Sequence, residues 1–220
     1  MPKSSDVVLN LWKKHLGSVP DSVWERTELE SLILADNKLA EISERIGDLS
    51  RLRMLDLGHN DLTQLPESLG KIVGLSDFLY LHDNHLAALP PSLANLKDLR
   101  YLNISENRFT EFPESIAGMT GLLELRATDN SIAYLPASIE RLTRLRELHL
   151  RNNQLTALPE AIVGLKELRQ LDLRGNPIEY LPEALTLLPR LEKIDLRWVS
   201  TLRSSAVLAK LEASGCIVYR

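Results

Sequence analysis

Histidines, arginines and aromatic residues carry the binding chemistry that this 220-residue sequence offers. Histidine binds metal ions and titrates near neutral pH, and His82 and His85 flank Asp83-Asn84. We assign Asn84 to a structural pattern described below, and we expect the two imidazoles on either side of a turn. The sequence therefore predicts no metal site and no cofactor. The histidines are expected to be solvated side chains whose titration makes binding depend on pH.

Patterns that support catalysis are missing from the sequence. It has no glycine-rich phosphate loop and no Ser-His-Asp set. Its single cysteine, Cys216, has no histidine, aspartate or asparagine nearby in sequence to activate it as a nucleophile. We expect Cys216 to be a small buried packing residue, and a lone cysteine excludes a disulfide framework. The sequence predicts a protein that is not an enzyme.

Composition and charge argue against several classes of partner and location. The net charge of −4 argues against a nucleic-acid binder, which usually carries a basic surplus. No apolar run approaches the roughly 18 residues that a membrane span needs. The first residues lack the basic start and small-residue cleavage site of a signal peptide. We expect a cytoplasmic protein, with translocation into a host cell as the alternative, and a monomer is favoured.

A 23-residue repeat, L-x-x-L-x-L-x-x-N-x-L-x-x-L-P-x-x-[LI]-x-x-L-x-x, organises the chain. Its units begin at Leu29, Leu52, about Leu75, Leu99, Leu122, Leu145, Leu168 and Leu191. In L-x-x-L-x-L the fourth and sixth residues share one face of a strand, and the residue between them points the other way. A surplus residue lies between Leu75 and Asn84, where we expect a bulge beside Phe78 and Tyr80.

The proline-containing half of each unit must connect parallel strands. Proline fixes its own φ and disfavours a helix at the preceding residue, so we expect a short 3-10 or helical turn there. These arguments predict an α/β fold, a right-handed solenoid with a concave parallel sheet and short 3-10 or helical turns on its convex side. In the first unit Ser43 stands where the other units have proline.

One asparagine recurs in each of seven units, where the chain leaves the strand. The set is Asn37, Asn60, Asn84, Asn107, Asn130, Asn153 and Asn176. A turn buried between neighbouring units leaves backbone groups without water, and an amide side chain can both donate to them and accept from them. We expect a continuous ladder in which each asparagine bonds the backbone of its own turn and of the next unit.

The two ends of the stack must differ from the middle, because each would otherwise expose an apolar face. We predict one domain with an N-terminal helical cap and half repeat over 1–28, eight units over 29–198 and a C-terminal cap over 199–220. The first cap is expected to hold a helix over 4–16, capped by a serine at 4 or 5. Its apolar stripe would consist of Val8, Leu11, Trp12 and Leu16. Trp12 and Trp24 would cover the first unit, and a helix from about Ser204 to Gly215 followed by a strand would close the last.

The fragments LPESLGKIVGL, LRYLNISENRF and LTALPEAIVGLKELRQLDLRGNPI resemble the leucine-rich repeat family, in its 23-residue L-P-x-x-[LI] subclass. The resemblance covers essentially residues 19–200. That subclass includes intracellular Ras-binding scaffolds, plant Ras-group-related proteins and bacterial proteins, among them effectors delivered into host cells. The resemblance implies the solenoid fold, and it says little about the specific function.

Function is expected on the strand positions that face away from the leucines. The candidate partner-binding residues are Met54, Phe78, Tyr80, His82, Tyr101, Arg126, His149, Arg151, Arg174, Arg197 and Trp198. Exposed aromatic side chains are typical anchors for a protein partner. The arginines either bind an acidic segment of that partner or pair with local acids such as Asp172 and Asp195, and the sequence leaves both open.

The sequence therefore predicts a non-enzymatic protein-interaction module or scaffold that binds a protein or peptide on its concave sheet. The alternative function is that of a bacterial effector or accessory subunit acting on host ubiquitin or signalling enzymes.

Overall fold

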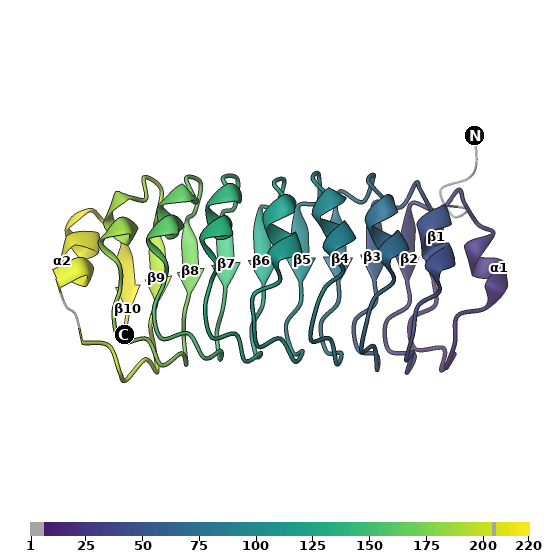
Figure 1. The fold of residues 1–220 in the computed structure, drawn as a ribbon, viewed down its shortest axis with the longest axis horizontal. Helices are drawn as coiled ribbons and strands as arrows, with labels where there is room; N and C mark the ends of the chain where they lie inside the picture. Colours follow the sequence, from purple (N-terminus) through teal and green to yellow (C-terminus); the bar gives the residue numbers. More distant parts are fainter. Residues whose placement is uncertain (1–6, 204–205) are drawn as a thin grey trace.

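The computed structural model describes residues 7–203 and 206–220, which form a single row of strands joined by short helical turns (Figure 1). Ten strands make one parallel sheet in chain order. They are β1 Val8–Asn10, β2 Ser31–Ile33, β3 Met54–Asp56, β4 Phe78–Tyr80, β5 Tyr101–Asn103, β6 Glu124–Arg126, β7 Glu147–His149, β8 Gln170–Asp172, β9 Lys193–Asp195 and β10 Ile217–Tyr219. The predicted solenoid with a concave parallel sheet is confirmed.

Short helices cover the other side of this sheet, and Figure 1 views them in front of the strands. The 3-10 helices are η1 Glu44–Asp48, η2 Glu67–Lys71, η3 Pro91–Asn95, η4 Glu114–Gly118, η5 Ala137–Arg141, η6 Glu160–Gly164 and η7 Glu183–Leu187. A proline precedes each of η2 to η7, as the repeat predicts, and Ser43 precedes η1. The Ser43 hydroxyl accepts a hydrogen bond from the Arg45 N–H at 3.2 Å, so serine caps the turn that lacks proline.

The leucines of the repeat form one continuous apolar core between the sheet and the 3-10 helices. The middle residue of each of β2 to β9 is buried, whereas its neighbours within the strand face outward. Because side chains alternate along a strand, one leucine pointing inward fixes the outward direction of both neighbours. None of the helices in the described parts of the chain is long and apolar enough to cross a membrane.

The seven repeated asparagines link each unit to the one before it. Asn153 is typical: its Oδ1 accepts from the Ile132 N–H at 2.9 Å, and its Nδ2 donates to the carbonyls of Ala127 at 2.8 Å and Leu150 at 3.0 Å. The other six asparagines also accept from backbone N–H groups: those of Lys14 and Leu16 for Asn37, those of Asn37 and Leu39 for Asn60, and those of Leu62, Leu86, Phe109 and Leu155 for the remaining four. The bonds run to the asparagine's own turn and to the preceding unit, whereas we expected the next unit.

The N-terminal segment corrects the sequence prediction. The part of the predicted 4–16 helix that the structure describes contains strand β1, which pairs in parallel with β2. Leu9 and Leu11 pack against the core, and Val8 is exposed. The edge of β2 would otherwise present unpaired backbone groups, and pairing with β1 satisfies them. Trp12 is 55% exposed, so it does not cover the first unit.

The half repeat that follows Pro20 and the C-terminal helix and strand agree with the prediction. Trp24 is buried at the end of α1 (Asp21–Trp24), which follows Pro20 in the proline phase of the repeat. At the other end, α2 (Ala206–Ala213) and β10 form the predicted helix and strand, and Cys216 is buried between them. The predicted serine caps at 4 and 5 and the helix start at Ser204 lie outside the described residues.

The surplus residue of the third unit does not produce a bulge. Strand β4 pairs in regular register with β3 and β5, with Leu79 opposite Leu55 and Leu102. The extra residue is accommodated in the loop before β4, where the Asp77 N–H still donates to the Arg53 carbonyl at 2.9 Å. A loop accepts an insertion at lower cost than a strand, because a one-residue shift inside the strand would turn its leucine outward.

The asparagine bonds predict a measurable loss of stability. Asn153→Ala leaves four backbone groups of two neighbouring turns without their amide partner, so it should lower the free energy of unfolding by about 1–3 kcal/mol. The matched control is Asn95→Ala, which removes an exposed amide from η3. It should change the free energy by less than about 0.5 kcal/mol. Urea denaturation of the three proteins checks this, and equal stability of Asn153→Ala and wild type would contradict it.

Candidate functional site

The outward strand positions share a single open surface. Residues in register across the sheet, such as Met54, Phe78 and Tyr101, lie on neighbouring strands about 4.8 Å apart. Asp56, Tyr80 and Asn103 form the next row on the same face, separated from the first by buried leucines. The candidate residues at these positions are therefore neighbours, although the sequence places them 23 or 24 residues apart.

Three aromatic side chains on β4 and β5 form what we name the aromatic cluster: Phe78, Tyr80 and Tyr101. The Phe78 and Tyr80 rings stack at 5.8 Å between centroids, and the Tyr101 ring lies 5.5 Å from Phe78 and 5.1 Å from Tyr80. Phe78 is 43% exposed, whereas the two tyrosines are half-buried. The three rings therefore contact one another and still leave part of their surface open to solvent.

Burial and neighbouring charges affect the ionisation of the two tyrosines in the aromatic cluster. Burial raises the pKa of both tyrosines, and the Glu124 carboxylate acts in the same direction. The phenols are thus neutral near pH 7 and available as hydrogen-bond donors. A hollow of about 290 Å³ beside the cluster is lined by Asp77, Phe78, Arg100, Tyr101, Leu123 and Glu124. Met54 lies half-buried next to Phe78, and its sulfur accepts a weak hydrogen bond from Ser31.

Each of the four candidate arginines pairs with an acidic side chain. Arg126 Nε lies 2.6 Å from Glu124 Oε1, and Arg151 Nη2 lies 2.9 Å from Asp129 Oδ2. The remaining two pairs are bidentate: Arg174 on Asp172, with bonds of 2.9 and 2.6 Å, and Arg197 on Asp195, with bonds of 3.0 and 2.7 Å. Of the two readings that the sequence leaves open, this geometry favours local pairing.

Buried carboxylates hold the C-terminal arginines in place. Burial alone would raise the pKa of Asp195, but hydrogen bonds and charge from Arg197 outweigh it and the pKa is lowered. Trp198 is 70% exposed, and the guanidinium carbons of Arg174 and Arg197 lie 5.8 and 5.9 Å from its ring centroid. Trp198 therefore packs over a neutralised arginine pair at the end of the surface.

Two histidines meet at the N-terminal side of the aromatic cluster. Nε2 of His82 lies 3.2 Å from Nε2 of His59, and His59 Nδ1 lies 2.6 Å from Asp83 Oδ2. The contact joins His82 to His59 and not to His85, and the 23-residue spacing of His59 and His82 is its signal in the sequence. His85 lies near Asp61, at 3.7 Å.

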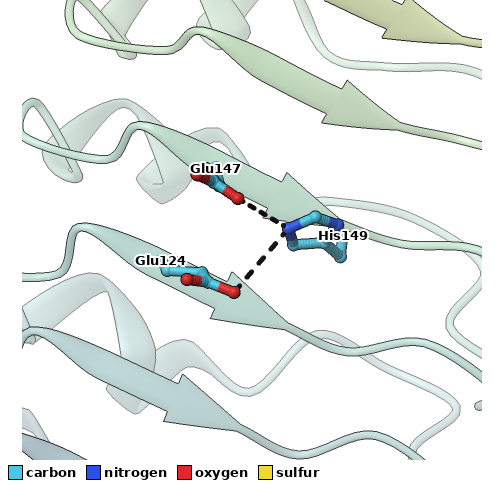
Figure 2. A group of neighbouring side chains, drawn as sticks. All are labelled: Glu124, Glu147 and His149. Atoms are coloured by element: carbon cyan, nitrogen blue, oxygen red, sulfur yellow. Dashed lines mark hydrogen bonds and ion pairs between the residues drawn. The ribbon is translucent and has the colours of Figure 1, made fainter.

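A third group of titratable side chains on the concave face was not predicted from the sequence. Glu124 on β6 lies directly opposite Glu147 on β7, and His149 follows Glu147 on the same face (Figure 2). One ligand atom from each of the three residues lies within 4.8 Å of the other two. The signal is present in the sequence, because two glutamates at the same repeat phase precede a histidine by 25 and two residues.

His82 predicts a pH-dependent contribution to stability. Burial, and then the charge of His59, lower its pKa below the ordinary 6.5, against the opposing effect of Asp56, Glu106 and Asp83. The unfolded chain therefore takes up this proton first, and the free energy of unfolding falls as the pH drops through and below 6.5. His82→Gln should reduce that fall. Urea denaturation between about pH 8 and about pH 5 tests it, and identical pH profiles for variant and wild type would refute it.

Comparisons with known proteins agree with this architecture. A leucine-rich repeat protein of Leptospira interrogans has a TM-score of 0.73 and 25% identity, covering 93% of this chain and 64% of its own. The ectodomain of the plant membrane receptor kinase GASSHO1/SCHENGEN3 from Arabidopsis thaliana, in complex with CASPARIAN STRIP INTEGRITY FACTOR 2, has a TM-score of 0.73 and 30% identity, over 81% of this chain and 22% of that chain. The plant peptide hormone receptor RGFR1 in complex with RGF2 has a TM-score of 0.73 and 32% identity, over 82% and 30%.

The chain spans less than two thirds of the length of each of these structures. A comparison with curated proteins returned no match. The family profile described as leucine rich repeat matches residues 7–75, 78–132 and 135–178, which is more than half of the sequence. The chain belongs to the leucine-rich repeat family.

Proposed function

We propose that this chain is a non-enzymatic protein-interaction module that binds a protein or peptide on its concave sheet. The observation that carries the proposal is the aromatic cluster on the open face of the sheet, where three rings contact one another and Phe78 remains 43% exposed. Aromatic anchors of this kind supply much of the binding energy in protein interfaces. The two plant receptor structures support the same use of the fold, because each contains a bound partner.

The aromatic cluster suits an extended segment or loop with apolar side chains. Fully burying a phenylalanine ring contributes about 1.5–3 kcal/mol, and Phe78 has exposed surface left to bury. The neutral phenols of Tyr80 and Tyr101 can donate hydrogen bonds to backbone carbonyls of the partner. Met54 extends the apolar surface toward β2 and adapts to partner shape because its side chain is flexible.

The arginines have a secondary role in this proposal. An acidic partner segment would have to share guanidinium groups that Asp172 and Asp195 already occupy, and the Asp195 side chain is only 4% exposed. We propose that Arg126, Arg151 and Arg197 orient the partner and contribute little affinity. His82, His149, Arg174 and Trp198 would line the same path along the sheet.

The proposal extends to the subclass and location of the protein. The 23-residue offset between paired strands and the proline before each of η2 to η7 favour the L-P-x-x-[LI] subclass. We also propose that the protein is cytoplasmic and monomeric.

A capture experiment tests the aromatic anchor. The immobilised chain, the Phe78→Ala/Tyr80→Ala variant and a control are incubated with the same cell extract, and bound proteins are quantified by mass spectrometry. Loss of the anchor should reduce capture of the specific partner by at least about tenfold, because hot-spot residues each contribute about 2 kcal/mol or more.

The control is Tyr134→Ala/Tyr180→Ala. It removes two exposed tyrosines that lie outside the ten strands, so it matches the aromatic content lost while leaving the concave face intact. The control should capture the partner as the wild type does. If the aromatic variant and the control retain the same protein equally, the concave anchor is excluded.

The paired arginines make a separate prediction about ionic strength. Because their charge is already neutralised, the Kd for the partner should rise only a few-fold between low and physiological salt. Binding titrations at several salt concentrations measure this. A steep loss of affinity with salt, abolished by Arg151→Gln, would show instead that the arginines bind an acidic partner segment directly.

A further inference from the structure

Glu124, Glu147 and His149 form a compact donor set on the concave face (Figure 2). The set adjoins the aromatic cluster, because Glu124 on β6 pairs with Tyr101 on β5. Nε2 of His149 lies 3.2 Å from Glu147 Oε2 and 3.8 Å from Glu124 Oε1. All three side chains are partly buried: the exposed fraction is 24% for Glu124, 35% for Glu147 and 19% for His149. Because short paired strands hold them, their backbones are fixed relative to one another.

These distances suit a small divalent ion. Around a tetrahedral zinc ion with bonds of about 2.0–2.1 Å, neighbouring ligand atoms are about 3.3 Å apart. The separations of 3.2 and 3.8 Å between the imidazole nitrogen and the two carboxylate oxygens are close to that value. One histidine and two carboxylates are ligands that zinc accepts, and three protein ligands leave a fourth position open toward solvent.

The charges of the group also favour a cation. Glu124 and Glu147 face each other across neighbouring strands, where like charges are destabilising. Arg126 bonds Glu124 through Oε1 at 2.6 Å, so it compensates one carboxylate directly. Glu147 instead faces the His149 imidazole, with its Oε2 3.2 Å from Nε2. A divalent ion between the three ligand atoms would offset the negative charge of both carboxylates.

We propose that Glu124, Glu147 and His149 bind one divalent transition-metal ion of the zinc class on the concave sheet. Arg126 acts as the competitor, since its guanidinium occupies the Glu124 oxygen that the ion needs and must move aside. The site does not depend on the proposed partner, because all three ligands belong to this chain.

Zinc titration of the full chain by calorimetry tests this proposal, with Co²⁺ absorption spectra as a second readout. Wild type should bind one ion, and His149→Gln and Glu147→Gln should each weaken binding by at least about tenfold. Arg126→Gln should bind zinc more tightly than wild type, because it removes the competing cation. Zinc should also raise the Tm of wild type but not that of His149→Gln.

His59→Gln/His82→Gln is the control for the other histidine pair, and it should retain wild-type zinc affinity. Circular dichroism of each metal-free variant separates loss of binding from loss of fold, and the gain of affinity in Arg126→Gln cannot arise from misfolding. The proposal is overturned by absence of zinc binding to folded wild type. It is also overturned if binding is retained in His149→Gln and lost in the His59→Gln/His82→Gln control.

Discussion

The bonds between the repeated asparagine amides and the turn of the preceding unit are the constraint on which this structure depends. Each turn leaves backbone groups that water cannot reach, and one side chain that both accepts and donates satisfies groups in two units at once. The leucine core supplies the apolar driving force, but burial is non-directional and would tolerate small slips between units. The amide bonds are directional, so they select the 23-residue register in which Leu32, Leu55 and their counterparts lie side by side.

Register in turn determines the concave surface. A one-residue slip would turn a leucine outward and a surface residue inward along the whole strand. With the register held, Phe78, Tyr80 and Tyr101 meet as one aromatic cluster, and Glu124 faces Glu147. The same regularity brings the arginines close together, and paired acids such as Asp195 neutralise them. The periodic arrangement thus places the aromatic cluster on one part of the concave surface and the paired arginines and acids on another.

The fold was predictable from the repeat, because the 23-residue period and the positions of leucine and proline within each unit all require the same solenoid. The N-terminal segment was mispredicted since its apolar spacing fits a helix locally, whereas the open edge of β2 provides backbone partners that only a strand can use. The bulge was mispredicted because a loop before β4 accommodates the extra residue. Positions on the concave face followed from phase, but contacts such as His59 with His82 depend on side-chain rotamers, which a repeat pattern does not specify.

Native-state hydrogen exchange tests the role of the asparagine bonds most directly. The amides of Leu39, Leu62, Leu86, Phe109, Ile132 and Leu155 each donate to the asparagine of the following unit. If these bonds hold the units in register, the six amides exchange only through the opening that unfolds the core, with protection close to that of the buried strand amides. Exchange of these amides at rates typical of exposed turns, while the strand amides stay protected, would contradict the account.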